Sequence, residues 1–143
     1  MERTAEARWQ GALRDGQGTL RLGSGAFEGK YSFSTRFEGA PGTNPEELLG
    51  AAHAGCFSMA LAHGLAQAGH PPTSLETKAT VHLDKAGAGF AITSIDLDTR
   101  AEVPALSNQE FQSLVEQAKT GCVMCQALRA VPVRLRATLT GAQ

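Results

Sequence analysis

The 143-residue sequence predicts an α+β fold in a single domain, residues 1–143, and three observations support this class. Segments with the alternating pattern of strands come in runs, not in regular alternation with helices. One long apolar helix is expected in the middle of the chain, over residues 44–69. Two shorter helices are expected near the C-terminal end, before a last strand.

The composition limits the classes of function. Hydrophobic residues make up 42% and charged residues 19% of the chain, as in ordinary soluble globular proteins. Thirteen Lys and Arg against fourteen Asp and Glu leave no basic surplus for nucleic acid or an acidic membrane. The first ten residues lack the apolar core of a signal peptide, and the central helix is expected to be too short and too interrupted by His53, His63 and Gly64 to span a bilayer. We therefore expect a cytoplasmic protein.

The N-terminal part of the chain predicts a hairpin and a further strand. Residues 7–22 have the pattern of a hairpin with its turn at residues 15–18. Over residues 31–37, aromatic and threonine side chains alternate with polar ones, which is the period of a strand with one apolar face. Arg36 is expected on the polar side of this strand. A turn-rich loop, residues 38–43, leads into the central helix.

The central helix is expected to begin at Asn44, whose side chain can cap the first turn. Pro45 suits the first helical position, and Glu46 and Glu47 complement the positive end of the helix dipole. Residues 70–72 are expected to end the helix. The apolar residues between leave no broad polar face, so we expect protein on all sides. A helix of about 25 residues is about 37 Å long; one chain of this size can hardly bury it, so we expect an intimate homodimer.

Two long strands are expected after the central helix. Apolar and polar residues alternate over residues 79–84 and again over residues 95–98, with a turn at residues 86–89. Phe90 and Ile92 are out of phase with the alternation of Ile95 and Leu97. This change of phase predicts a bulge near Thr93 or Ser94. These features predict a curved meander.

Two helices and a strand complete the chain. Ser107 and Glu110 form a capping-box pattern for a helix that is expected to end near Gly121. A short helix is expected to start around Cys122. Residues 131–139 then predict an amphipathic last strand.

Cys56, Cys122 and Cys125 carry the candidate chemistry, because three cysteines in a cytoplasmic chain are not a structural disulfide framework. Cys56 lies in the apolar helix, and burial alone makes a thiol inert. A fixed guanidinium beside it would stabilise the thiolate, which is the nucleophile. Arg36 is the candidate cation, and Glu46 is the carboxylate that could orient it by a bidentate hydrogen bond.

Cys122 and Cys125 form a CxxC motif at a helix start, and three interpretations of the thiols remain open. A thioredoxin-type dithiol would need a βαβ context that the sequence lacks. His53 and Cys56 are three residues apart on one helical face and complete a Cys3His set suitable for zinc, in a stress protein without enzyme activity. In the third, Cys56 is oxidised to a sulfenic acid that condenses with a thiol of the second region.

Two runs resemble the OsmC/Ohr family of bacterial hydroperoxide-reducing proteins, and specifically its OsmC branch. They are TRFEGAPGTNPEELLGAAHAGCFSMAL at residues 35–61 and AKTGCVMCQAL at residues 118–128. The resemblance implies an α+β fold of antiparallel sheets around a long buried helix, in an intertwined homodimer with two active sites at the subunit interface. It also implies a cysteine-dependent peroxidase that prefers organic hydroperoxides to hydrogen peroxide. No metal or organic cofactor is implied, and the expected electron donor is a dithiol, namely a dihydrolipoyl group.

Residue by residue, the resemblance implies that Cys56 is the peroxidatic cysteine and Cys122 the resolving cysteine. It places Arg36 beside the thiolate and makes Glu46 the carboxylate partner of Arg36. Cys125 departs from the family pattern, because a serine is usual at this position. Cys56 could therefore pair with Cys122 first and hand the bond to a Cys122–Cys125 disulfide.

The spacing of Glu46 and Cys56 sets a condition on the site. On one straight helix the two residues would lie about 15 Å apart along the axis, too far to share an arginine side chain. Either the helix breaks near Gly50, or the charged pair and the thiol come from different subunits. The second alternative is favoured, and it makes the dimer obligatory for activity. Hydrophobic peroxides are expected to enter past a set of apolar side chains, namely Phe37, Phe57 and Met59.

Overall fold

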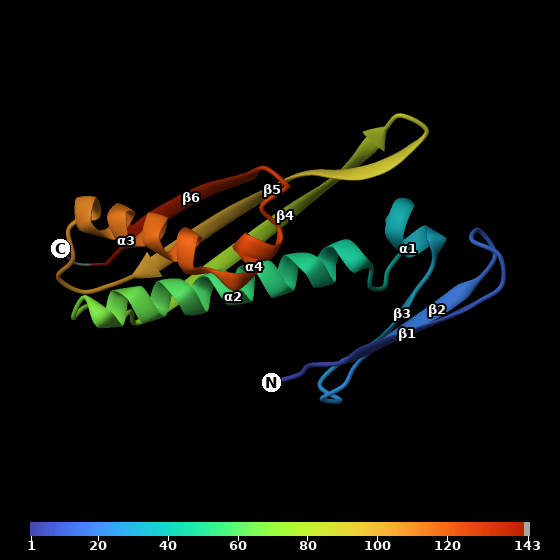
Figure 1. Ribbon diagram of the computed structural model, residues 1–143, viewed down its shortest axis with the longest axis horizontal. Coiled ribbons are helices and arrows are strands. Elements are labelled where there is room, and N and C mark those ends of the chain that lie inside the picture. The colour runs from blue at the N-terminus through green and yellow to red at the C-terminus, as the bar shows by residue number, and fades with distance from the viewer. Residues whose placement is uncertain (142–143) are drawn as a thin grey trace. The chain divides into compact units, whose positions relative to one another are not determined.

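The computed structural model describes residues 1–141, which form two units, one at Met1–Leu48 and one that begins at Leu49. Figure 1 labels the helices and strands along the chain. The first unit holds a three-stranded sheet and a short helix. The second holds another three-stranded sheet, nearly all of the central helix and two further helices. The expected α+β class is confirmed.

The sheet of the first unit consists of β1 (Ala5–Gln10), β2 (Gln17–Leu22) and β3 (Glu28–Tyr31), all antiparallel. The predicted hairpin is therefore confirmed. Trp9 on β1 and Tyr31 on β3 both pair with Gly18 on β2, and their rings contact each other with centroids 5.3 Å apart. A Cβ atom at position 18 would lie 2.5 Å from the Tyr31 ring, so only glycine lets the two rings meet across the middle strand.

The strand predicted over residues 31–37 is wrong beyond Tyr31, because Phe33–Phe37 form a short helix, α1. Ser32 caps this helix: its hydroxyl accepts a hydrogen bond from the Thr35 amide, and the Thr35 hydroxyl accepts one from the Ser32 amide. Such reciprocal capping satisfies two backbone donors and favours a turn of helix over an extended strand. Arg36 consequently projects from a helix, not from the polar side of a strand.

The central helix α2 (Pro45–Gln67) is confirmed with its predicted cap. The Asn44 side-chain oxygen accepts a hydrogen bond of 2.8 Å from the Glu47 amide. The helix continues through Gly50, so the predicted alternative of a break there is wrong. Its end is set by Gly69, whose φ of 87° and flanking hydrogen bonds, Gly69 to Ala66 and His70 to Leu65, form a Schellman motif ahead of the prolines.

One stripe of α2 is fully buried within the chain, and protein on its other sides, expected from a second copy of the chain, stays a prediction. The stripe consists of His53, Phe57, Leu61 and Leu65. Met59 points away from it and is 77% exposed. By length and composition alone α2 could cross a membrane, so the expectation that it is too short and too interrupted is wrong. Its stripe packs into the hydrophobic core, as in the core helix of a soluble protein.

The sheet of the second unit has the order β4-β5-β6, with β4 at Ser74–Ala86, β5 at Gly89–Glu102 and β6 at Val133–Thr140. The register between β4 and β5 shifts at His82/Leu83, which leaves Thr93 as the extra residue of the predicted bulge. β6 runs parallel to β5, so the expectation of purely antiparallel sheets is wrong. A parallel pair needs a long crossover connection.

Helices α3 (Asn108–Gly121) and α4 (Val123–Ala127) form this crossover. The Ser107 hydroxyl caps α3 by accepting a hydrogen bond from the Glu110 amide, as predicted. Cys122 ends α3 and caps α4, also as predicted. Both α2 and α3 lie along the β4-β5-β6 sheet (Figure 1). The chain thereby places Cys122 and Cys125 on a connection that packs into the core containing α2.

The inner face of this sheet joins α2 through apolar packing and one partly buried chain of hydroxyl groups. Ile95, Leu97 and Ala101 are buried there with the stripe of α2. Ser58 on α2 donates a hydrogen bond of 2.7 Å to the Thr77 hydroxyl, which lies 2.8 Å from that of Thr99. Because each of these three hydroxyls has a partner, including that of the buried Thr99, the hydrogen-bonded chain fixes α2 against the sheet without leaving an unsatisfied group.

Replacing Phe57 with alanine is expected to lower the free energy of unfolding by about 3–5 kcal/mol. Phe57 is fully buried, so the truncation removes a large apolar side chain and leaves a cavity. Urea unfolding followed by circular dichroism measures the change. Phe57→Leu is the matched control and should cost less than about 1.5 kcal/mol. A loss below about 1 kcal/mol in Phe57→Ala would contradict this packing.

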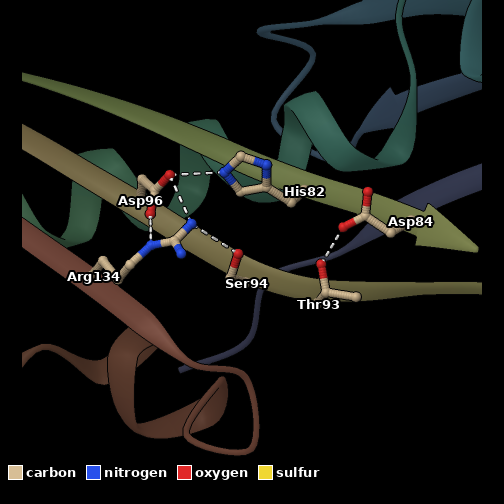
Figure 2. A network of polar contacts seen from close by, with 6 residues as sticks. All are labelled: His82, Asp84, Thr93, Ser94, Asp96 and Arg134. Atoms are coloured by element: carbon tan, nitrogen blue, oxygen red, sulfur yellow. Dashed lines mark hydrogen bonds and ion pairs between the residues drawn. The ribbon is translucent and has the colours of Figure 1, made fainter. Parts of the chain in front are cut away.

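The outer face of the sheet carries a network of polar contacts (Figure 2). Asp96 on β5 lies between His82 on β4, at 2.7 Å, and Arg134 on β6. Arg134 also donates a hydrogen bond of 3.2 Å to Ser94. The hydrogen bond from Arg134, then the one from His82, lowers the pKa of Asp96 from 3.8 to about 2. The network thus joins three neighbouring strands by their side chains.

The Asp96 carboxyl is therefore expected to titrate near pH 2. Because its pKa is lower in the folded state, its contribution to stability is present above pH 3.8 and is lost as the pH falls through about 2. A carboxyl-carbon NMR titration measures the midpoint directly. Arg134→Gln removes the main cause and should return the midpoint toward 3.8. A wild-type midpoint near 3.8 would show that the network does not form in solution.

Candidate active site

A thiol and imidazole cluster lies inside the second unit. His53 projects from α2, Cys122 caps α4, and Cys125 lies in the first turn of α4. The His53 Nε2 and Cys125 Sγ atoms are 3.1 Å apart. The Cys125 amide donates a hydrogen bond of 3.3 Å to Cys122 Sγ. One ligand atom from each residue lies within 4.8 Å of the others, so the fold brings together side chains that are far apart in sequence.

Burial sets the protonation of this cluster. His53 and Cys122 are fully buried, and Cys125 is 9% exposed. Burial lowers the pKa of His53. Burial first, then the hydrogen bond with Cys122, raises the pKa of Cys125 to about 12. A neutral thiol therefore faces a neutral imidazole, and the Cys125 S–H can donate to His53 Nε2.

The second nitrogen of His53 completes this assignment. If Nε2 accepts from the thiol, the ring proton is on Nδ1. Nδ1 is buried and has no hydrogen-bond partner among residues 1–141. Among residues 1–141 the His53 side chain therefore makes one hydrogen bond, from its Nε2 atom to the Sγ atom of Cys125.

Cys56 lies one turn after His53 on α2 and is half-buried at the edge of the core. A thiolate on Cys56 would repel a thiolate on Cys125, and this repulsion is one of the smaller causes of the raised pKa of Cys125. All three cysteines are free thiols. The structure thus brings Cys56 near the CxxC motif without forming a bond to it.

The predicted zinc set is only partly assembled. His53, Cys122 and Cys125 lie within ligand distance of one another, and Cys56 does not belong to this group. A thiolate and imidazole set suits zinc in donor type. Metal-binding histidines usually donate their second ring N–H to a partner, and His53 Nδ1 has none among the described residues. The cluster fits hydrogen-bonded thiols better than a structural metal site.

The predicted pair of Arg36 and Glu46 is confirmed in the first unit. Glu46 Oε1 accepts hydrogen bonds from Arg36 Nε at 3.0 Å and from Nη2 at 2.7 Å. Glu46 is buried in the first turn of α2, whereas the Arg36 side chain is 38% exposed. A two-point contact to a buried carboxylate fixes the plane of the guanidinium and leaves its remaining donors available for an anionic group.

An aromatic cleft opens beside Arg36 in the first unit. Its lining includes Trp9, Tyr31, Phe33 and Phe37 together with Arg36. The rings of Phe33 and Phe37 are 5.0 Å apart, and the Arg36 guanidinium lies 5.1 Å from the Phe37 ring centre. Of the side chains predicted to line a peroxide entrance, Phe37 lines this cleft, whereas Phe57 is fully buried in the core and does not line it. Trp9 was missed, although an aromatic residue in a hairpin that precedes the arginine was a usable signal.

Comparisons with known proteins identify the family and agree with the fold. Residues 37–136 match the family described as OsmC-like protein. The sequence is 48% identical to peroxiredoxin OsmC of Escherichia coli (strain K12) over 131 residues, covering 91% of this chain and 92% of the relative. It is 33% identical over 92 residues to an organic hydroperoxide resistance protein of Xanthomonas axonopodis pv. citri, covering 64% of this chain and 63% of the relative.

Solved structures show the same fold. The organic hydroperoxide resistance protein OhrB of Bacillus subtilis superposes with a TM-score of 0.68 at 25% identity, covering 96% of this chain and 98% of that one. An OsmC-like protein of unknown function from Vibrio cholerae superposes with a TM-score of 0.76 at 18% identity, covering 96% and 99%. The second likeness supports the fold alone.

Proposed function

The chain belongs to the OsmC-like family, and from this premise we infer that it is a thiol-dependent peroxidase that reduces organic hydroperoxides to alcohols. The observation that carries this conclusion is the 48% identity to a peroxiredoxin over nearly the whole chain. Three free thiols, Cys56 on the long helix and Cys122 and Cys125 in the core that packs against it, supply the chemistry that such a reaction needs. Protection against oxidative stress follows from removal of the peroxide.

We propose that Cys56 is the peroxidatic cysteine. Its thiolate attacks the distal oxygen of ROOH, the O–O bond breaks, and RO⁻ takes up a proton and leaves as ROH. Cys56 is then a sulfenic acid, oxidised by two electrons. Condensation with the Cys122 thiol forms a Cys56–Cys122 disulfide and releases water. Half-burial at the edge of the core leaves Cys56 more accessible than the other two thiols.

Arg36 is proposed to stabilise the Cys56 thiolate and the developing alkoxide, with Glu46 holding the guanidinium in position. The bidentate contact between the two side chains supports this role, because it fixes where the positive charge points. The aromatic cleft beside Arg36 supports a preference for peroxides with a hydrophobic R group over hydrogen peroxide.

A homodimer with two active sites at the subunit interface is part of the proposal. Two features support it: α2 exposes the face that carries Met59, and the helix has no break at Gly50 that would bring Glu46 toward Cys56 of the same chain. Met59→Asp places a charge on this face and should give a folded, inactive monomer. Light scattering, circular dichroism and the peroxidase assay measure the three properties. A folded monomer with full activity would refute the shared site.

The proposed electron donor is a dithiol, and a dihydrolipoyl group is the expected one. A dithiol reduces a protein disulfide by two successive exchanges and leaves as its own cyclic disulfide. Steady-state turnover with dihydrolipoamide should exceed turnover with the monothiol glutathione at equal thiol concentration. Equal rates with both donors would contradict this choice. The proposed compartment is the cytoplasm, where free thiols stay reduced.

The decisive test adds one equivalent of cumene hydroperoxide to the reduced, chelator-treated protein without a reductant. Free thiols should fall from three to one per chain as cumyl alcohol forms. In Cys122→Ser the reaction should stop at a sulfenic acid on Cys56, which dimedone labels. Three thiols that survive the peroxide unchanged would overturn the peroxidase assignment.

A further inference from the structure

We propose that Cys125 is a second resolving cysteine and that His53 accepts its proton. In this step, which rests on the proposed function, the Cys125 sulfur attacks Cys122 in the Cys56–Cys122 disulfide. The oxidising equivalents then reside in a Cys122–Cys125 disulfide, and Cys56 is a thiol again.

The positions of the two sulfurs support the exchange. Cys122 caps α4 and Cys125 lies in its first turn, and their Sγ atoms are within 4.8 Å. An S–S bond is about 2.05 Å long. Rotation of the Cys122 and Cys125 side chains at the start of α4 can bring the two sulfurs to this distance. The Cys125 amide already donates to Cys122 Sγ and thereby holds that sulfur toward its neighbour.

His53 supplies what Cys125 lacks. Only a thiolate attacks a disulfide efficiently, and a buried thiol holds its proton tightly. The His53 Nε2 atom lies 3.1 Å from Cys125 Sγ and is the one ring nitrogen with a partner among the described residues. The proton can therefore pass along an existing contact as the sulfur attacks, without any movement of a solvent molecule into the core.

The step is balanced in atoms and electrons. The Cys125–Cys122 bond forms and the Cys122–Cys56 bond breaks, so Cys125 is oxidised and Cys56 is reduced. The proton of Cys125 passes to His53, and Cys56 leaves as the thiolate. The proposed Arg36 charge favours this leaving group, because a stabilised thiolate leaves faster. No oxidant beyond the first peroxide is needed.

The exchange has a consequence that stoichiometry can measure. A chain with only Cys56 and Cys122 is spent after one peroxide. With the relay, Cys56 is free to react with a second peroxide and to stop as a sulfenic acid. The reduced wild-type protein should therefore consume two equivalents of cumene hydroperoxide per chain without a reductant, whereas Cys125→Ser should consume one.

Peptide mapping identifies the bond after the first equivalent. Cys122 and Cys125 lie on one tryptic peptide, residues 120–129, so their disulfide lowers its mass by two hydrogens, whereas a bond to Cys56 links two peptides. Wild type should give the internal disulfide with Cys56 open to alkylation. Cys125→Ser should stop at the Cys56–Cys122 link. His53→Gln should still form that link but convert it to the internal disulfide at least tenfold more slowly.

The outcomes separate the relay from the underlying peroxidase. One equivalent consumed by wild type, ending in a Cys56–Cys122 link with Cys125 alkylatable, overturns the relay and leaves the proposed function intact. No loss of thiols in either protein overturns both. The Cys125→Ser comparison decides the question even if a His53 variant fails to fold, because serine differs from cysteine by a single atom.

Discussion

Replacing Cys56 with serine is expected to lower the rate of organic hydroperoxide reduction at least about a thousandfold, to the level of the uncatalysed background. A serine hydroxyl is not ionised near neutral pH and cannot carry a stable sulfenic acid. Both the attack on the peroxide and the later disulfide therefore fail in this variant. Stopped-flow kinetics with cumene hydroperoxide, in which the loss of peroxide is followed, measure the rate.

The fold of Cys56→Ser should be intact, because the substitution is nearly isosteric and the position is only half-buried. Glu116→Gln, an exposed change on α3, is the matched control and should keep the wild-type rate. If Cys56→Ser retained a rate within tenfold of wild type, the peroxidatic role would have to move to Cys122 or Cys125.

Replacing Arg36 with alanine is expected to lower kcat/KM for the peroxide by about 10²–10³-fold, the effect of losing one preorganised charge at a reacting centre. The thiolate fraction of Cys56 should fall as well. The rate of alkylation by iodoacetamide at a fixed pH reports that fraction independently of the peroxide reaction. Arg21→Ala, which removes an exposed arginine of β2, is the control and should change neither rate.

Two further variants separate the charge of Arg36 from its orientation. Arg36→Lys keeps a positive charge but cannot make the two-point contact with Glu46, and Glu46→Gln keeps the arginine but removes the carboxylate. Each is expected to cost about tenfold in kcat/KM, less than Arg36→Ala. If Arg36→Lys matched the loss in Arg36→Ala, position and not charge would be the main contribution of the guanidinium.

Local signals in the sequence predicted those elements whose stability is local. The Asn44 cap and the Ser107 cap each depend on residues within a few positions of one another, and the bulge at Thr93 is signalled by a change of alternation within one strand; all three are present. Alternation over residues 31–37 was misleading, since the five residues Phe33–Phe37 fit a strand or a single capped turn of helix equally well. There the hydrogen bonds of Ser32 decided the outcome.

Features that depend on distant residues could not be predicted in the same way. The parallel pairing of β6 with β5 is a choice of strand neighbour, and the alternation within β6 is the same for either direction. The contact between His53 and Cys125 joins positions 72 residues apart, so the sequence linked these two residues to each other only as members of a possible zinc set. Arg36 and Glu46 could be named as a candidate pair because a thiolate needs a fixed cation and a guanidinium needs a carboxylate to orient it, and the resemblance pointed to the same two residues.

The crossover that carries α3 and α4 also has a bearing on how the protein is made. His53 and Cys56 are synthesised about seventy residues before Cys122 and Cys125, and the crossover must dock before the cluster exists. Contacts of such long sequence separation form late and slowly in folding. Until then three unprotected thiols share one flexible chain and can form wrong disulfides. Refolding under oxidising conditions should therefore trap misfolded chains, whereas a reducing environment lets the α2 stripe find its sheet before any sulfur is oxidised.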